Sequence, residues 1–226
     1  MNINARYLLL LLVLCTGVAG AQNYRDSLGV INPQQYSKQI KLKPDRKLVE
    51  ITKYIPGIRL DIRYATTDNF MHERMYNQAR AFTRLPVAMA LKAVQAELNA
   101  KGLGLKIYDG YRPYTITEKF YKKASDKHFV ADPKKGSKHN RGCAIDLSLI
   151  NLKTGQELDM PTPFDSFSKL AAANYTDLPA QVIQNRELLK TVMESHGFRV
   201  LDNEWWHFDF IGWQNFEILD VPFEQL

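Results

Sequence analysis

The chain has 226 residues, of which 45% are hydrophobic and 24% are charged. This composition excludes an intrinsically disordered or fibrous protein and predicts one compact domain with its own hydrophobic core. The formal net charge of +6 is spread along the chain without a long basic run, so nothing in it indicates nucleic-acid binding.

Residues 1–21 have the pattern of a secretory signal peptide. A short segment with one arginine is followed by the apolar run Tyr7–Val18, and small residues precede Gln22. An uncleaved anchor is disfavoured because the run is shorter than the roughly 20 residues that span a bilayer. A lipoprotein is disfavoured because a leucine, not a small residue, precedes Cys15. We expect cleavage before Gln22 and an exported protein, periplasmic or secreted, with no stable membrane insertion.

The mature chain divides into a lead-in and a domain. Residues 22–47 are polar and aperiodic, which predicts a loosely held lead-in, and residues 48–226 form the domain. Cleavage leaves Cys143 as the only cysteine, so an intramolecular disulfide is excluded.

The first half of the domain shows strand patterns followed by one clear helix. Residues 49–54 carry β-branched and aromatic side chains, and residues 58–64 alternate apolar with charged, as a half-buried strand does. After Pro86, apolar residues recur at helical spacing until Gly102, which predicts an amphipathic helix.

The second half alternates strands and helices. A short strand around residues 105–107 runs into a Gly-Tyr-Arg-Pro turn, and residues 143–149 alternate with Asp146 on the polar face. We also expect helices over about 115–124 and 181–195 and a strand over 206–210. The elements predict an α+β fold, a single compact domain with a small antiparallel sheet flanked by helices.

Two polar clusters could supply a metal site on that sheet. His139 lies in a loop seven residues before Asp146, and Gly142 between them lets the backbone bend. Strand alternation places His207 opposite its apolar neighbours, with Glu204 just before it. Two histidines and an aspartate make an open zinc site, although a histidine beside tryptophan is more often packed or hydrogen-bonded than bound to a metal, so the residues alone favour that explanation.

Several motifs together resemble a known family. They are Ser137-x-His-x-x-Gly-x-Ala-x-Asp146, Glu204-Trp-Trp-His207, Asp109-Gly-Tyr-Arg-Pro113 and Arg63-Tyr-Ala-Thr-Thr-Asp-Asn-Phe70. The set is similar to the zinc D-Ala-D-Ala peptidases, and most closely to their D-alanyl-D-alanine dipeptidase branch, from about residue 49 to residue 210.

The resemblance implies a role for each matching residue. One Zn²⁺ per chain would be held by His139, Asp146 and His207, and Glu204 would act as general base and then general acid. Arg112 would stabilise the oxyanion of the tetrahedral intermediate. The substrate residues that the resemblance implies are Tyr64, Ser137 and Asp165, with Asp165 facing the ammonium of the dipeptide and Ser137 its carboxylate.

The resemblance implies hydrolysis of D-Ala-D-Ala to two D-alanines by a zinc-activated water. Two alternatives stay open: a D,D- or L,D-carboxypeptidase that trims peptidoglycan stem peptides with the same zinc site, and an inactive binding module. The presence of both Glu204 and Arg112 disfavours the inactive module. The resistance dipeptidases of this family are generally intracellular, so the expected export favours turnover or scavenging of peptides in the envelope.

Overall fold

The computed structural model of the protein describes residues 24–124, 126–127 and 130–226. The expected signal peptide and His128 lie outside these residues. Within the described ranges, none of the helices combines the length and the apolar character needed to cross a membrane.

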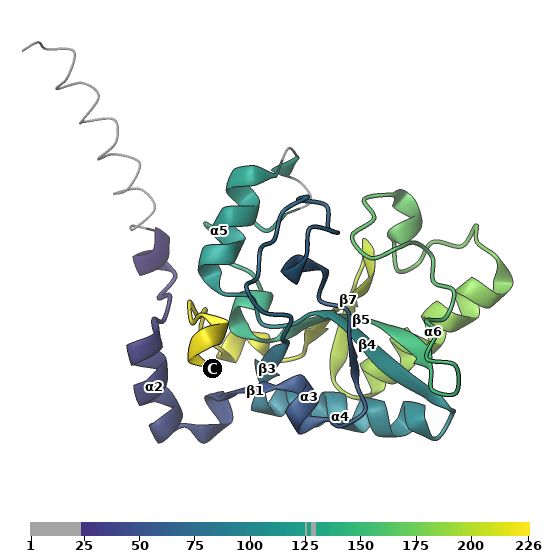
Figure 1. Ribbon diagram of the computed structural model, residues 1–226, viewed down its shortest axis with the longest axis horizontal. Coiled ribbons are helices and arrows are strands. Elements are labelled where there is room, and N and C mark those ends of the chain that lie inside the picture. Colours follow the sequence, from purple (N-terminus) through teal and green to yellow (C-terminus); the bar gives the residue numbers. More distant parts are fainter. Residues whose placement is uncertain (1–23, 125, 128–129) are drawn as a thin grey trace, which may run out of the picture.

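Helices and strands alternate along the chain (Figure 1). The helices are α2 Pro33–Leu42, α3 Ile51–Tyr54, α4 Leu85–Asn99, α5 Tyr114–Lys123 and α6 Ala180–Ser195. The strands are β1 Leu48–Glu50, β2 Arg59–Leu60, β3 Phe82–Arg84, β4 Leu103–Asp109, β5 Ala144–Asn151, β6 Phe198–Leu201 and β7 Glu204–Phe210. The expected helices α4, α5 and α6 and the expected strands β4, β5 and β7 are confirmed to within a few residues.

A five-stranded sheet in the order β2-β4-β5-β7-β6 forms the centre of the fold. The pairs β4–β5, β5–β7 and β7–β6 are antiparallel, as expected. The edge pair β2–β4 is parallel, which corrects the expectation of a purely antiparallel sheet. A parallel neighbour needs a crossover connection, and α4 provides it between β2 and β4.

The two faces of this sheet are covered differently (Figure 1). Helices α4 and α6 pack on one face through fully buried residues such as Leu91, Val94 and Leu189. Helix α5 and the long loops that follow β2 and β5 lie on the other side. Strand β5 is therefore buried on both faces, and polar side chains on its loop-covered face can be held in a closed environment.

Two strand predictions are wrong in part. Residues 49–54 begin as β1 but continue as the short helix α3. The predicted strand over 58–64 is reduced to β2, and the chain then turns through the 3-10 helix Arg63–Ala65. Ile58 and Ile62 are buried as the alternation requires, but the turn takes Tyr64 out of strand geometry and into the interior.

The segment predicted as a loosely held lead-in contains helix α2. Asn32 and Gln35 form a capping box, and Pro33 occupies the first helical position. Tyr36 is buried, and its hydroxyl accepts the backbone N–H of Leu48 at 2.7 Å. A polar composition does not prevent this packing, because one aromatic side chain and one cap are enough to anchor a short helix.

Candidate metal centre and active site

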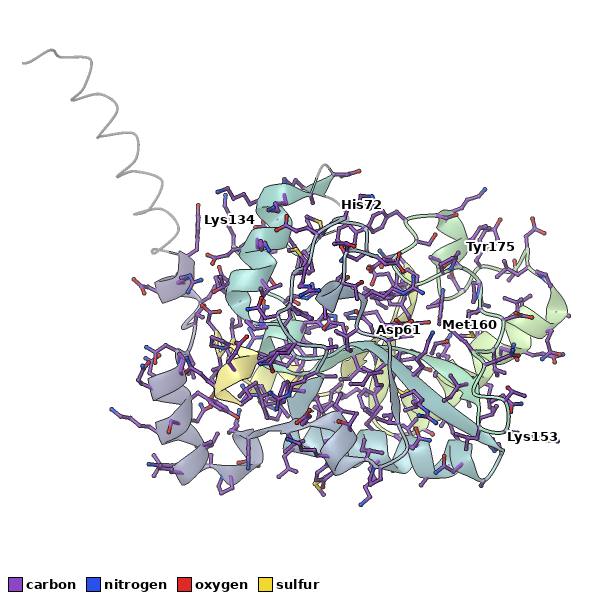
Figure 2. All side chains as sticks on the ribbon, in the orientation of Figure 1. Asp61, His72, Lys134, Lys153, Met160 and Tyr175 are labelled. Atoms are coloured by element: carbon purple, nitrogen blue, oxygen red, sulfur yellow. The ribbon has the colours of Figure 1, made fainter. Side chains whose placement is uncertain are left out.

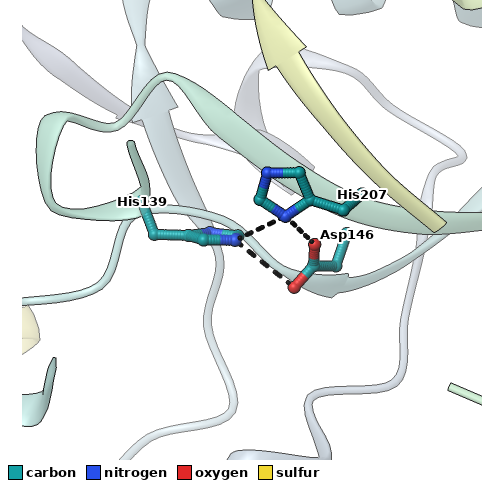
Figure 3. Close-up of side chains that lie close together, drawn as sticks. All are labelled: His139, Asp146 and His207. Carbon is teal, nitrogen blue, oxygen red and sulfur yellow. Dashed lines mark hydrogen bonds and ion pairs between the residues drawn. The ribbon is translucent and has the colours of Figure 1, made fainter. Parts of the chain in front are cut away.

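Three potential metal ligands converge on the loop-covered face of the sheet (Figure 3). Asp146 on β5 and His207 on β7 are register partners, so their side chains leave the sheet on the same face. His139 begins the 3-10 helix His139–Arg141, which Gly142 ends in the left-handed conformation at φ +68°. The three ligand atoms lie within 4.8 Å of one another, and all three residues are buried.

Outer hydrogen bonds determine which ring nitrogens of the two histidines carry protons. Nδ1 of His139 lies 2.7 Å from the carbonyl oxygen of Gly110, and Nε2 of His207 lies 3.0 Å from Oδ1 of Asp209. A carbonyl or carboxylate oxygen only accepts, so these two nitrogens donate. In the neutral rings, the inner nitrogens, Nε2 of His139 and Nδ1 of His207, then point lone pairs at each other across 3.2 Å.

Asp146 adds negative charge to this point. Its Oδ2 lies 3.5 Å from Nε2 of His139, and its Oδ1 lies 3.0 Å from Nδ1 of His207. Oδ1 is buried and has no hydrogen-bond partner among the residues that the structure describes. Such a cluster requires a positive charge between its atoms, supplied by a proton or by a metal ion.

The electrostatics show how strongly the cluster attracts a cation. Burial lowers the pKa of His207, yet the carboxylates of Asp146 and Asp209 outweigh it and raise that pKa to about 10. Burial also opposes ionisation of Asp146, but the two histidines hold the pKa of its carboxyl below the usual range. Two imidazoles and one carboxylate are a donor set that zinc accepts in catalytic sites with an open fourth position, so these residues fit the expected metal.

Glu204 lies beside the cluster without belonging to it. It is the first residue of β7, and its Oε2 lies 3.9 Å from Nδ1 of His207. Burial raises the pKa of Glu204 above its usual range, against the opposing influence of His207. A carboxyl group with a raised pKa next to a metal site is suited to accept a proton and to return it.

A buried aspartate that sequence analysis left without a role anchors Arg112. Oδ2 of Asp109 accepts hydrogen bonds from Nε and Nη2 of Arg112, at 3.1 and 2.7 Å. The other carboxylate oxygen accepts from the hydroxyl of Tyr76 and from the backbone N–H of Gly110. Within the described part of the chain, Nη1 of Arg112 makes no hydrogen bond, so this edge of the guanidinium is the one available to a substrate.

Tyr64 and Asp165 form a second polar pair. The tyrosine hydroxyl donates to the Asp165 carboxylate, at 2.9 Å from Oδ2 and 3.1 Å from Oδ1. Asp165 has a positive φ of +61°, a conformation that costs free energy outside glycine and that clusters at functional sites. Burial and then the charge of Asp146 raise the pKa of Asp165 well above its usual value, so this carboxyl favours a cationic partner.

One cavity of about 290 Å³ joins these groups. Ser137 lines it as well, and its hydroxyl also accepts the backbone N–H of His139 at 3.0 Å, which stabilises the ligand loop. The structure therefore brings together the eight site residues that the sequence predicts: Tyr64, Arg112, Ser137, His139, Asp146, Asp165, Glu204 and His207.

The described histidines outside the cluster take other positions. His196 follows α6, and its Nε2 lies 2.9 Å from a carboxylate oxygen of Glu97 on α4. His72 is exposed on a loop at the upper edge of the molecule in Figure 2. Neither histidine lines the cavity.

Comparisons with known proteins identify the family of this chain. The family described as D-Ala-D-Ala dipeptidase, peptidase family M15, matches residues 44–223. The D-alanyl-D-alanine dipeptidase of Escherichia coli K12 is 34% identical over 163 residues, which cover 72% of this chain and 84% of the relative. The enzyme of the same name from Enterococcus faecalis V583 is 32% identical over 184 residues, which cover 71% of this chain and 90% of the relative.

Solved structures give weaker similarities. The LD-carboxypeptidase LdcB has a TM-score of 0.43 at 19% identity, covering 74% of this chain and 69% of that chain. The vancomycin resistance D,D-dipeptidase VanXYg has a TM-score of 0.39 at 21% identity, covering 60% of this chain and 53% of that chain. The match over residues 44–223 is the stronger finding, and it shows that this chain is a hydrolase belonging to the D-Ala-D-Ala dipeptidase family, peptidase family M15.

Proposed function

We propose that the protein hydrolyses free D-Ala-D-Ala to two molecules of D-alanine at one zinc ion held by His139, Asp146 and His207. The observation that carries this proposal is the shared cavity, in which one face offers three metal ligands and the other walls offer Glu204, Arg112 and Asp165. When bound, zinc would lower the pKa of a water molecule and polarise the peptide carbonyl.

The side chains around the ligands supply the remaining steps. Glu204 accepts a proton from the attacking water and donates it to the leaving amine. Arg112, held by Asp109, offers Nη1 to the carbonyl oxygen as it gains negative charge. Because Arg112 is already oriented before substrate arrives, little reorganisation is needed in the transition state.

The residues on the cavity wall opposite the metal ligands favour a short substrate. Asp165 is partly buried and paired with Tyr64, so an ammonium group can compensate for its charge, whereas an amide nitrogen in a longer peptide cannot. Ser137 lines the same cavity and would donate its hydroxyl to the carboxylate at the other end of the dipeptide. A cavity of about 290 Å³ lies at the lower end of the range for ligand sites, which favours a dipeptide over a stem peptide.

The test is D-alanine release by residues 22–226 from three substrates: the free dipeptide, an amino-capped dipeptide and a stem pentapeptide. Each is measured with chelator and again after zinc is added back. We expect cleavage of the free dipeptide alone, abolished by chelator and restored by zinc. Equal or preferred cleavage of the longer substrates would refute the dipeptidase proposal and identify a carboxypeptidase.

The role of Glu204 is tested by Glu204→Gln with zinc content measured in parallel. General acid–base catalysis contributes roughly 10²–10⁴-fold, so kcat is expected to fall by about that factor while zinc stays bound. Glu194→Gln is the matched control because Glu194 is exposed on α6, outside the cavity. Unchanged turnover in Glu204→Gln would exclude the proposed proton transfer.

We also infer that the protein acts outside the cytoplasm. The support is the charged, apolar and small-residue order of residues 1–21. Amino-terminal sequencing of the protein from fractionated cells is expected to show Gln22 as the first residue in the periplasmic or secreted fraction. An intact Met1 in the cytoplasmic fraction would contradict export.

A further inference from the structure

The outer hydrogen bond of His207 continues into a chain of three side chains. Nε2 of His207 lies 3.0 Å from Oδ1 of Asp209, and Oδ2 of Asp209 accepts from Nζ of Lys138 at 2.5 Å. Asp209 is only 8% exposed, so each of its oxygens is held by one partner in a nearly closed environment. Figure 3 shows the second ring nitrogen of His207 turned away from the other two residues of the ligand cluster.

The chain connects the two segments that carry the histidine ligands. Asp209 lies on β7 two residues after His207, and Lys138 directly precedes His139 in the ligand loop. These segments are 71 residues apart in sequence at the Lys138–Asp209 bond. The ammonium of Lys138 also lies 5.4 Å from the centre of the Trp213 ring, which restricts where it can reach.

The two histidine ligands are held in different ways. A backbone carbonyl, that of Gly110, orients His139, so no side-chain change removes that contact. His207 depends on the carboxylate of Asp209, a side chain outside the cavity that holds the substrate. The orientation and the tautomer of His207 can therefore be altered without touching the metal ligands or the walls of the cavity.

We propose that Asp209, held in place by Lys138, is a positioning residue of the metal centre. It keeps the proton of His207 on Nε2 and thereby directs the lone pair of Nδ1 at the metal. Lys138 fixes the second oxygen of Asp209 and so ties the ligand loop to the ligand strand. This inference rests on the proposed function, because it assumes that the cluster binds zinc.

The experiment measures zinc affinity by chelator competition, independently of turnover, in full-length mature protein. The variants are Asp209→Ala, Asp209→Asn and Lys138→Met, with Arg199→Met as control. Arg199 is the register partner of Asp209 on β6 and lines the same outer pocket, but makes no hydrogen bond to Asp209 within the described residues. Lys138→Met and Arg199→Met remove the same charge near the same carboxylate.

Removing an outer hydrogen-bond partner of a metal-bound histidine typically weakens metal affinity about 10–100-fold. We expect that loss in Asp209→Ala, a smaller one in Asp209→Asn because its amide oxygen still accepts from Nε2, and a smaller one again in Lys138→Met. Arg199→Met should bind zinc as the wild type does. Visible absorption of the cobalt-substituted protein should shift in Asp209→Ala and stay unchanged in the control.

Each outcome decides the matter. Tight zinc binding in the wild type and equally tight binding in Asp209→Ala would overturn the inference and leave the proposed function standing. A wild-type protein that binds no zinc would refute both the proposed function and this inference. Equal losses of zinc affinity in Lys138→Met and Arg199→Met would show an effect of net charge and would refute the role of Lys138. If Asp209→Ala does not fold, the zinc affinities of Asp209→Asn and Lys138→Met still test the inference.

Discussion

The turn that joins the ligand loop to β5 depends on a glycine that can be tested directly. Gly142 has φ +68°, and a Cβ at this position would lie 2.7 Å from Cδ2 of Leu48 and 3.3 Å from the backbone nitrogen of Arg84. Leu48 is only 4% exposed, and the Arg84 N–H donates to the carbonyl of Gly142 itself, so neither neighbour can move freely. Gly155 has nearly the same φ, +71°, with open space around it.

This pair separates the backbone cost of alanine from its packing cost. A left-handed conformation costs an L-residue about 1–2 kcal/mol, which applies to both positions. Forcing an extra methyl group into a packed interior costs about 1–3 kcal/mol more, which applies only to Gly142. We therefore expect Gly155→Ala to lower the free energy of unfolding by about 1–2 kcal/mol and Gly142→Ala by about 2–5 kcal/mol.

The assay is urea unfolding of the chelator-treated protein, followed by zinc titration of each folded variant. Zinc affinity should fall in Gly142→Ala, because the turn sets the distance between His139 and Asp146, and should not change in Gly155→Ala. Equal free energies of unfolding for the two variants would refute the packing argument. Unchanged zinc affinity in a destabilised Gly142→Ala would show that the ligand loop adjusts independently of the turn.

Two further predictions concern the frame around the site. Tyr36→Phe leaves the buried N–H of Leu48 without its acceptor and should lower the free energy of unfolding in urea by about 1–3 kcal/mol. Tyr54→Phe is the control and should lower it less, because the Tyr54 hydroxyl makes no hydrogen bond in the described part of the chain. The Arg80 guanidinium lowers the pKa of Glu50 from 4.5 to about 2. Because the pKa of Glu50 is lower in the folded protein than in the unfolded one, its ionised form stabilises the fold at pH values above the unfolded pKa. The extra stability of the wild type over Glu50→Gln should therefore be complete above pH 4.5 and disappear as the pH falls toward 2. The measurement is thermal unfolding of the chelator-treated proteins across this pH range, and a pH-independent difference would contradict the prediction.

Local pattern explains which elements could be predicted. Helices α4 and α6 carry apolar residues at helical spacing, and β5 alternates, because each packs one side against the same core. Residues 58–64 alternate equally well but form mostly a turn, because tertiary contacts bring Tyr64 inward to Asp165. Helix α2 was missed because its signal is a capping box and one tyrosine, without an apolar stripe.

The site shows the same division between local and distant information. The convergence of His139, Asp146 and His207 could be predicted because a family motif places these residue types at fixed spacing, whereas metal binding and the catalytic roles stay predictions. The role of Asp109 could not be predicted, because its hydrogen bonds to Tyr76 and Arg112 depend on the fold. The sequence alone does not indicate which carboxylate pairs with Arg112. The sequence did contain a signal for Asp209: it lies two residues after His207, and strand alternation puts both side chains on the same face of the sheet. Its bond to Lys138 follows only from the fold.

The balance of charge in the cavity connects metal binding to substrate binding. Three carboxylates line it among the described residues, Asp146, Asp165 and Glu204, and its guanidinium, Arg112, is already paired with Asp109. Burial, and after it the neighbouring negative charge, raises the pKa of Asp165 and Glu204. A dication at the ligand cluster compensates for two of these charges and so favours the ionised form of Asp165. In the proposed function, Asp165 binds the ammonium group of the dipeptide in that ionised form, so zinc and substrate are expected to favour each other's binding through this carboxylate as well as at the metal.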